Sequence, residues 1–158
     1  MPKAFISYYH KDDSKRKILE ELLKDNGILP LVVSERTSPS TLLSDKVVND
    51  IEKADFLVPV LTRSSINTQW INQEIGYASK LAREEEIKIF PLVEDNIISE
   101  LRGFIHKQMD LPFKFKGGSD LANENYYFKK ACKELVVYLK TLPDDKDGSP
   151  KMFFLPSR

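Results

Sequence analysis

The sequence predicts an α/β protein in which a parallel sheet of about five strands is covered by helices on both faces. Short apolar runs alternate along the chain with longer segments whose apolar residues recur at helical spacing. The apolar runs contain few polar positions, as expected for strands that are buried on both faces, and such strands are typical of parallel sheets. Right-handed crossovers between them then fix the hand of the fold.

The predicted strands are runs of apolar and β-branched residues, with a short fifth strand last: 3–9, 28–33, 55–61, 86–93 and 109–111. The third is almost entirely apolar, so we expect it at the centre of the sheet. Pro30 predicts an edge or bulged position for the second strand, because proline cannot donate to a ladder. Pro59 predicts an irregularity within the third.

Helical periodicity and end signals place helices between these strands. Asp12, Asp13 or Ser14 can cap the first helix, which ends at Asn26 and Gly27. The later predicted helices cover residues 42–54, 69–85, 98–105 and 123–142. One domain over residues 1–142 accounts for all these elements, and we expect residues 143–158 to form a flexible C-terminal tail.

Composition excludes several functional classes. The 158 residues are enough for one well-buried core, and 41% hydrophobic with 30% charged residues is typical of soluble globular proteins. Twenty-four basic and twenty-four acidic residues cancel, so no net field favours nucleic acid or an anionic membrane. Without a long apolar segment the chain is expected to be cytoplasmic. A single cysteine and two separated histidines predict no metal site.

Polar residues follow three of the predicted strands. In parallel sheets ligands bind beyond the carboxyl ends of the strands. That edge would hold Ser7, Tyr8 and Tyr9 after the first strand, and Ser34, Glu35 and Arg36 after the second. It would also hold residues 62–67 after the third strand. Segments that are far apart in sequence are therefore expected to converge on one cleft.

The helix that follows residues 62–68 carries the most informative run, Trp70-Ile71-Asn72-Gln73-Glu74-Ile75-Gly76-Tyr77-Ala78. Residues four apart share a helix face, so Trp70 and Glu74 lie one above the other, beside an apolar stripe through Ile71 and Ile75. Glu74 is expected on the border of that stripe, partly desolvated, as reactive carboxylates often are. A solvated glutamate beside a packed tryptophan is the plainer interpretation.

Together these motifs resemble bacterial Toll/interleukin-1 receptor (TIR) domains. The resemblance is carried by Ala4-Phe5-Ile6-Ser7-Tyr8, by the strand and Ser/Thr-rich loop at 56–68, and by Trp70-x-x-x-Glu74-Ile75-Gly76-Tyr77-Ala78. It covers residues 3–140. It implies a flavodoxin-like three-layer sandwich, in a family where many bacterial and plant members cleave NAD, and it matches Glu74 to the family's signature glutamate.

The resemblance also implies that the loop at residues 34–42 gates the site and mediates self-association. This loop has Ser38-Pro39-Ser40 where many members have glycine. NAD would then be a substrate, with no resident cofactor and no metal. A nucleotide product would act on a separate effector, as in Thoeris-like antiphage defence.

Cleavage of the bond between nicotinamide and ribose passes through an oxocarbenium-like state, which a carboxylate can stabilise. Glu74 is the candidate for that role. The candidate substrate-binding residues surround it: aromatic walls from Phe5, Tyr8 or Trp70, polar contacts from Ser7, a phosphate contact from Arg36, and a ribose contact from Glu35. An exposed arginine on a loop, such as Arg36, is solvated more often than not, and Glu35 could equally cap a helix.

Three functions remain open from the sequence. The first is an NAD glycohydrolase or ADP-ribosyl cyclase that releases nicotinamide. The second is a non-catalytic TIR module that recruits other TIR domains through residues 34–42. The third is a different glycosyl-transferring enzyme, such as a nucleoside deoxyribosyltransferase, which also places a glutamate near a ribose. A scaffold needs no carboxylate in a cleft, so Trp70 and Glu74 favour the first.

Overall fold

The computed structural model describes residues 1–32, 45–67, 69–84, 86–100, 112–118 and 120–142. The predicted loop at 34–42, the predicted strand at 109–111 and the predicted tail at 143–158 lie outside these residues. So do the side chains of Gln69, Trp70 and Arg83.

The centre of the molecule is a parallel sheet with the strand order β2-β1-β3-β5-β6, and β4 also pairs with β3. Its strands are β1 (Lys3–Ser7), β2 (Leu29–Leu31), β3 (Phe56–Leu61), β4 (Lys88–Ile89), β5 (Leu92–Glu94) and β6 (Phe113–Phe115). The fully buried β3 lies in the middle and the Pro30 strand lies at the edge, as predicted.

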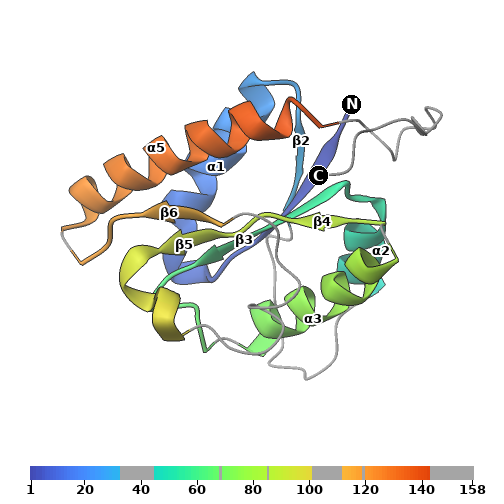
Figure 1. Cartoon of the computed structure of the whole chain (residues 1–158), viewed down its shortest axis with the longest axis horizontal. Coiled ribbons are helices and arrows are strands. Elements are labelled where there is room, and N and C mark those ends of the chain that lie inside the picture. The colour runs from blue at the N-terminus through green and yellow to red at the C-terminus, as the bar shows by residue number, and fades with distance from the viewer. Residues whose placement is uncertain (33–44, 68, 85, 101–111, 119, 143–158) are drawn as a thin grey trace.

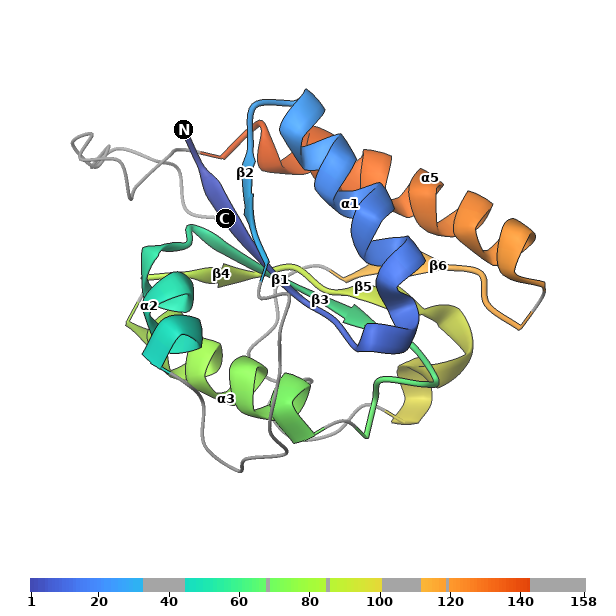
Figure 2. The same ribbon diagram turned by 180° about the vertical axis from the view of Figure 1, so that it is seen from behind.

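Helices cover both faces of this sheet, which makes three layers. They are α1 (Asp13–Asp25), α2 (Asp45–Lys53), α3 (Gln69–Arg83) and α5 (Leu121–Leu139), with 3-10 helices η1 (His10–Asp12) and η2 (Asp95–Glu100). Figures 1 and 2 show α1 and α5 together on one face and α2 and α3 on the other. The flavodoxin-like α/β sandwich predicted from the sequence is confirmed.

Alternation along the strands divides the core between the two faces. Ala4, Ile6 and Tyr8 pack in the cluster that contains the buried residues of α1 and α5. Phe5 packs in the other cluster, with buried residues of α2 and α3. Because successive side chains of a strand point to opposite faces, the side chain of Ser7 lies on the Phe5 face. This alternation along β1 determines which side chains at its end can contact α2 and α3, and which can contact α1 and α5.

Pro59 was predicted to make the third strand irregular, but β3 is continuous over Phe56–Leu61, and the interruption lies in the neighbouring segment, between β4 and β5. The pairings of β3 with β4 and of β3 with β5 keep one register, which places Pro59 opposite Pro91. Neither residue has a backbone N–H, so neither can donate to the ladder there. The predicted strand at 86–93 is therefore two short strands, with Phe90 N still donating to Leu57 O at 2.9 Å.

Other boundaries differ from the predictions in ways that the local chemistry explains. β1 ends at Ser7, because the chain turns into η1, where Asp12 N donates to Tyr9 O at 2.7 Å. In the part of the chain that the structure describes, the last strand is β6 at 113–115. Residues 98–100 of the predicted helix at 98–105 belong to η2, and residues 101–105 lie outside the described residues. None of the described helices is long and apolar enough to cross a membrane.

Candidate functional site

Ser7 and Glu74 meet at the carboxyl end of β1. The hydroxyl of Ser7 donates to Oε1 of Glu74 at 2.6 Å, and both residues are 0% exposed. A hydrogen bond to a carboxylate is stronger than one between neutral groups, and burial strengthens it further. The contact joins residues 67 positions apart in sequence and brings two of the predicted site residues together.

Two periodicities make this contact. Ser7 follows Phe5 on the face that α3 covers, and Ile71, Ile75 and Ala78 form the buried stripe of α3. Glu74 sits within that buried surface rather than on its border. The expectation of a partly exposed carboxylate was therefore wrong, because Ser7 provides a polar partner beneath the helix and permits full burial.

The two predicted aromatic walls from the first strand lie on opposite faces. Phe5 is fully buried in the core on the α3 side. Tyr8 belongs to the α1 and α5 cluster, where the Arg16 guanidinium lies 5.8 Å from its ring centre. The structure therefore does not bring Tyr8 beside Glu74.

Tyr9 is the aromatic residue after β1 that does pack against the α3 side, and it is only partly buried. Tyr9 lies two residues after Ser7 and four after Phe5, so alternation along the strand could have placed it on the same face as both. Glu35 and Arg36 lie outside the described residues. The backbone of Trp70 belongs to α3, but its side chain is also outside the described part.

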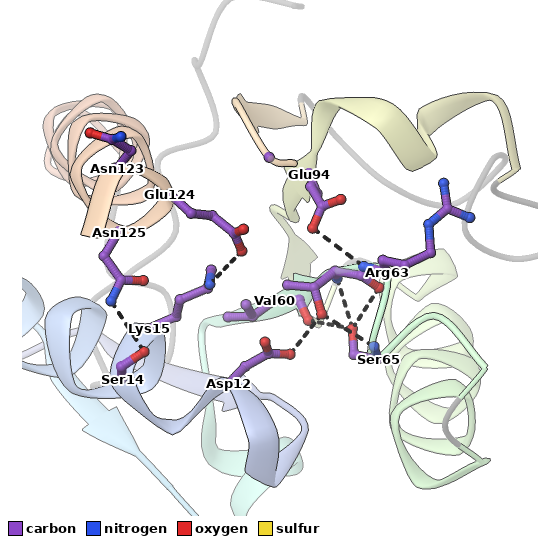
Figure 3. A network of polar contacts seen from close by, with 12 residues as sticks. Asp12, Ser14, Lys15, Val60, Arg63, Ser65, Glu94, Asn123, Glu124 and Asn125 are labelled. Atoms are coloured by element: carbon purple, nitrogen blue, oxygen red, sulfur yellow. Dashed lines mark hydrogen bonds and ion pairs between the residues drawn. The ribbon is translucent and has the colours of Figure 1, made fainter. Parts of the chain in front are cut away.

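A second polar group lies at the same edge, on the side of α1 and α5 (Figure 3). Thr62, directly after β3, donates its hydroxyl to Oδ2 of Asp12 at 2.7 Å, and both residues are buried. The sequence suggested Asp12 as a helix cap, but its side chain makes no capping bond to α1. Burial raises the pKa of the Asp12 carboxyl, and the Thr62 hydrogen bond opposes that rise only in part.

Ser65 completes a closed turn around Thr62. Thr62 N donates to Ser65 Oγ at 2.8 Å, and Ser65 N donates to Thr62 Oγ1 at 3.2 Å. Ser65 Oγ also donates to Val60 O at 3.1 Å, which ties the turn to β3. This turn begins the connection to α3.

Three further side chains extend the group. Glu94, at the end of β5, accepts from Arg63 N at 3.4 Å, and Lys15 pairs with Glu124 at 2.7 Å, as Figure 3 shows. No sequence motif pointed to Asp12 or Glu94 in these roles. Among the described residues, no group of three or more His, Cys, Asp or Glu side chains is arranged to hold a metal ion.

Comparisons with known proteins agree with this architecture. A family model described as "TIR domain" matches residues 4–126. A search of curated proteins finds no match.

Several solved structures share the fold at low identity. The flavodoxin-like domain of a Synechococcus protein has a TM-score of 0.57 at 13% identity, over 88% of this chain and 99% of that one. The TIR domains of the activated Roq1 resistosome give 0.54 at 12%, over 87% and 84%. The CMP N-glycosidase BcmB of Clostridium botulinum gives 0.51 at 16%, over 86% and 98%.

Proposed function

Because this chain belongs to the TIR domain family, we propose that it is an NAD-cleaving enzyme that releases nicotinamide, with Glu74 as its catalytic carboxylate. The observation that carries the proposal is the buried contact of Ser7 Oγ with Glu74 Oε1 at 2.6 Å. It holds a carboxylate at the carboxyl end of the first strand, where parallel sheets bind their ligands. The resemblance of residues 70–78 to the family's glutamate motif supports the same residue.

The proposed reaction breaks the bond between the nicotinamide nitrogen and C1′ of the ribose. The bonding electrons leave with nicotinamide, which departs as a neutral base, and positive charge develops on the ribose. A Glu74 carboxylate close to that charge stabilises it, and the Ser7 hydroxyl keeps the carboxylate in one orientation. Attack of water on C1′ then gives ADP-ribose and a proton. Attack by a nitrogen of the adenine gives a cyclic isomer instead.

Full burial of Glu74 sets a condition on this mechanism. NAD can touch the carboxylate only if the surface over it opens. We propose that self-association through residues 34–42 provides this opening, as the resemblance to TIR domains implies. Activity should then rise more steeply than in proportion to protein concentration.

The test is nicotinamide release from NAD by the purified chain at low and high protein concentration. Glu74→Gln keeps the shape of the side chain and removes its charge, so it should abolish release without unfolding the protein. Glu94→Gln is the matched control, since it neutralises another buried glutamate at the same edge. Release that persists in Glu74→Gln, or that is lost equally in Glu94→Gln, contradicts the assignment of Glu74.

Chromatography of the products separates hydrolysis from cyclisation. A cyclic product supports the proposal that this chain signals to a separate effector, as in Thoeris-like antiphage defence. Linear ADP-ribose alone would favour depletion of NAD as the output.

A non-catalytic TIR–TIR interaction module is the second candidate, and the inaccessible carboxylate of Glu74 favours it. A scaffold would self-associate without turnover. Absence of nicotinamide release from protein shown by light scattering to be assembled would favour this module over the enzyme.

A third candidate acts on another N-glycosidic bond. The fold neighbour from Clostridium botulinum is named a CMP N-glycosidase, so this fold accommodates cleavage of a base from a nucleotide. Incubation with CMP and with deoxynucleosides beside NAD tests the point. Release of free base from these substrates but not from NAD would support the third candidate.

A further inference from the structure

We propose that Asp12 is a positioning residue for Glu74: through Thr62 it clamps the β3–α3 connection and so fixes where the glutamate helix begins. The inference rests on the proposed function of Glu74. Asp12 does not touch Glu74 in this account, and it acts through the backbone that leads to α3.

The clamp consists of two buried hydrogen bonds between the same two segments. Ser7 and Asp12 belong to the short stretch from the end of β1 through η1, and Thr62 and Glu74 belong to the stretch from the end of β3 into α3. Ser7 donates to Glu74 at 2.6 Å, and Thr62 donates to Asp12 at 2.7 Å. A single contact would allow the two segments to pivot about it, and a second contact restricts that rotation.

Asp12 is itself held firmly relative to Ser7. Its backbone N–H donates to Tyr9 O at 2.7 Å, which closes the turn of η1. Asp12 is 6% exposed, and the bond of its side chain to Thr62 joins positions 50 apart in the sequence. The Asp12 carboxylate is therefore a fixed anchor on the β1 side.

On the β3 side, the turn that begins at Thr62 connects the Asp12 contact to α3. Thr62 Oγ1 donates to Asp12 and accepts from Ser65 N, so loss of this oxygen disturbs both contacts. Ser65 N and Ile66 N also donate to Thr62 O at 3.1 and 3.0 Å, which makes residues 62–66 a compact turn. This turn is also bonded to the start of α3, because Nδ2 of Asn72 donates to Ile66 O at 3.4 Å.

The test compares Thr62→Val, which is nearly isosteric but lacks the hydroxyl, with Thr62→Ser, which keeps it. If the clamp orients Glu74, Thr62→Val should lower kcat for nicotinamide release about tenfold or more and leave KM within about twofold, because misplacement of a catalytic group by a fraction of an ångström has effects of this size. Thr62→Ser keeps the hydroxyl and should therefore have a kcat close to that of the wild type. Asp12→Asn retains an acceptor oxygen and should stay close to wild type, whereas Asp12→Ala should resemble Thr62→Val.

Ser79→Ala is the matched control for a general loss of stability. Ser79 is buried on α3, and its hydroxyl donates within the helix, to Ile75 O at 2.7 Å. An equal fall of kcat in Ser79→Ala, or an unchanged kcat in Thr62→Val, would overturn the positioning role.

Hydrogen exchange provides a readout that does not need activity. Thr62→Val should accelerate exchange of the amides at 65–76 several-fold, leave α5 unchanged, and be reversed by Thr62→Ser. A wild-type protein without NAD cleavage would refute the proposed function alone, and the exchange pattern would still decide whether the clamp exists. Unchanged exchange at 65–76 would refute the clamp.

Discussion

Lys15 of α1 forms an ion pair with Glu124 of α5, with Nζ 2.7 Å from Oε1 and side chains only 3% and 17% exposed. Removal of one partner from a buried pair leaves the other charge without compensation. Asp12 and Glu94 lie close enough to add to the negative charge at this point. We therefore expect Lys15→Met to lower the free energy of unfolding by about 2–4 kcal/mol, measured by urea denaturation.

The double variant Lys15→Met with Glu124→Leu should recover most of that loss, because apolar side chains can replace a buried ion pair at little cost. The ring of Phe115, 6.0 Å from Lys15 Nζ, provides apolar surroundings for the new side chains. A double variant that is no more stable than Lys15→Met would show that the pair contributes through shape rather than charge.

Asp12 should give stability a pH dependence of unusual sign. Burial raises the folded-state pKa of this carboxyl above its ordinary value of 3.8, so the folded protein holds the proton more tightly than the unfolded chain. The contribution of Asp12 to stability therefore falls as pH rises from about 3.8 through the raised pKa. Asp12→Asn lacks this titration and retains an acceptor for Thr62.

Thermal unfolding between pH 4 and 7 checks this sign. The difference in Tm between Asp12→Asn and wild type should become more favourable to the variant as pH rises. The charged groups that face Asp12 are Lys15, Glu94 and Glu124, and all three side chains are present in both proteins. A difference that stays constant or shrinks as pH rises would contradict the raised pKa.

Much of the fold could be predicted because its determinants are local. Strands buried on both faces need continuous apolar runs, and β3 has one that is buried at every position. Pro30 also predicted its edge position from local chemistry, because it lacks a backbone N–H. The predicted strand at 86–93 was split because its interruption depends on the register that sets Pro91 opposite Pro59, which is a tertiary property.

The last strand shows a signal of a different kind. Phe113 and Phe115 are buried and Lys114 between them is exposed, as expected for an edge strand with one covered face. A search for continuous apolar runs passes over this alternation. A search for apolar residues at every second position would have predicted a strand at 113–115.

The candidate site also has features that the sequence predicts and features that depend on tertiary contacts. Convergence of Ser7 and Glu74 was predicted because the carboxyl ends of parallel strands share one edge of the sheet, whereas their direct hydrogen bond depends on how deeply α3 packs. Asp12 was assigned a capping role because capping is the commonest local use of aspartate at a helix start. Its actual partner, Thr62, is 50 positions away, and no local pattern announces such a pair.

The Ser7–Glu74 contact should be measurable without any substrate. Ser7→Ala leaves a buried carboxylate without one of its donors, and Glu74→Leu removes the acceptor. A double-mutant cycle with these two variants should give a coupling free energy of about 1.5–3 kcal/mol, the range for hydrogen bonds to charged groups.

Urea denaturation of the four proteins provides this coupling energy. Ser14→Ala with Asn125→Ala is the control cycle, because Asn125 Nδ2 donates to Ser14 Oγ at 3.2 Å between neutral groups in a part-buried position. Its coupling should be smaller. Equal coupling in both cycles would mean that Glu74 gains nothing from its charge in the folded state.

Gly117 packs so closely against Glu94 that a side chain at position 117 should destabilise the protein by steric overlap. A Cβ at Gly117 would clash with Cγ and Cδ of Glu94, which is buried and cannot move aside freely. Gly117→Ala should therefore lower the free energy of unfolding by about 1–3 kcal/mol, as overpacking does. Adding Glu94→Ala should relieve the clash, so that Gly117→Ala costs little in that background.

Gly118→Ala is the comparison that separates space from backbone strain. Gly118 has φ of 81°, and the nearest atom to its Cβ is Nδ2 of Asn96 at 3.6 Å, so its substitution is disfavoured by conformation and not by contact. Glu94→Ala should rescue Gly117→Ala but not Gly118→Ala in the same denaturation experiment. Rescue of both, or of neither, would show that Glu94 and Gly117 are not in the close contact described.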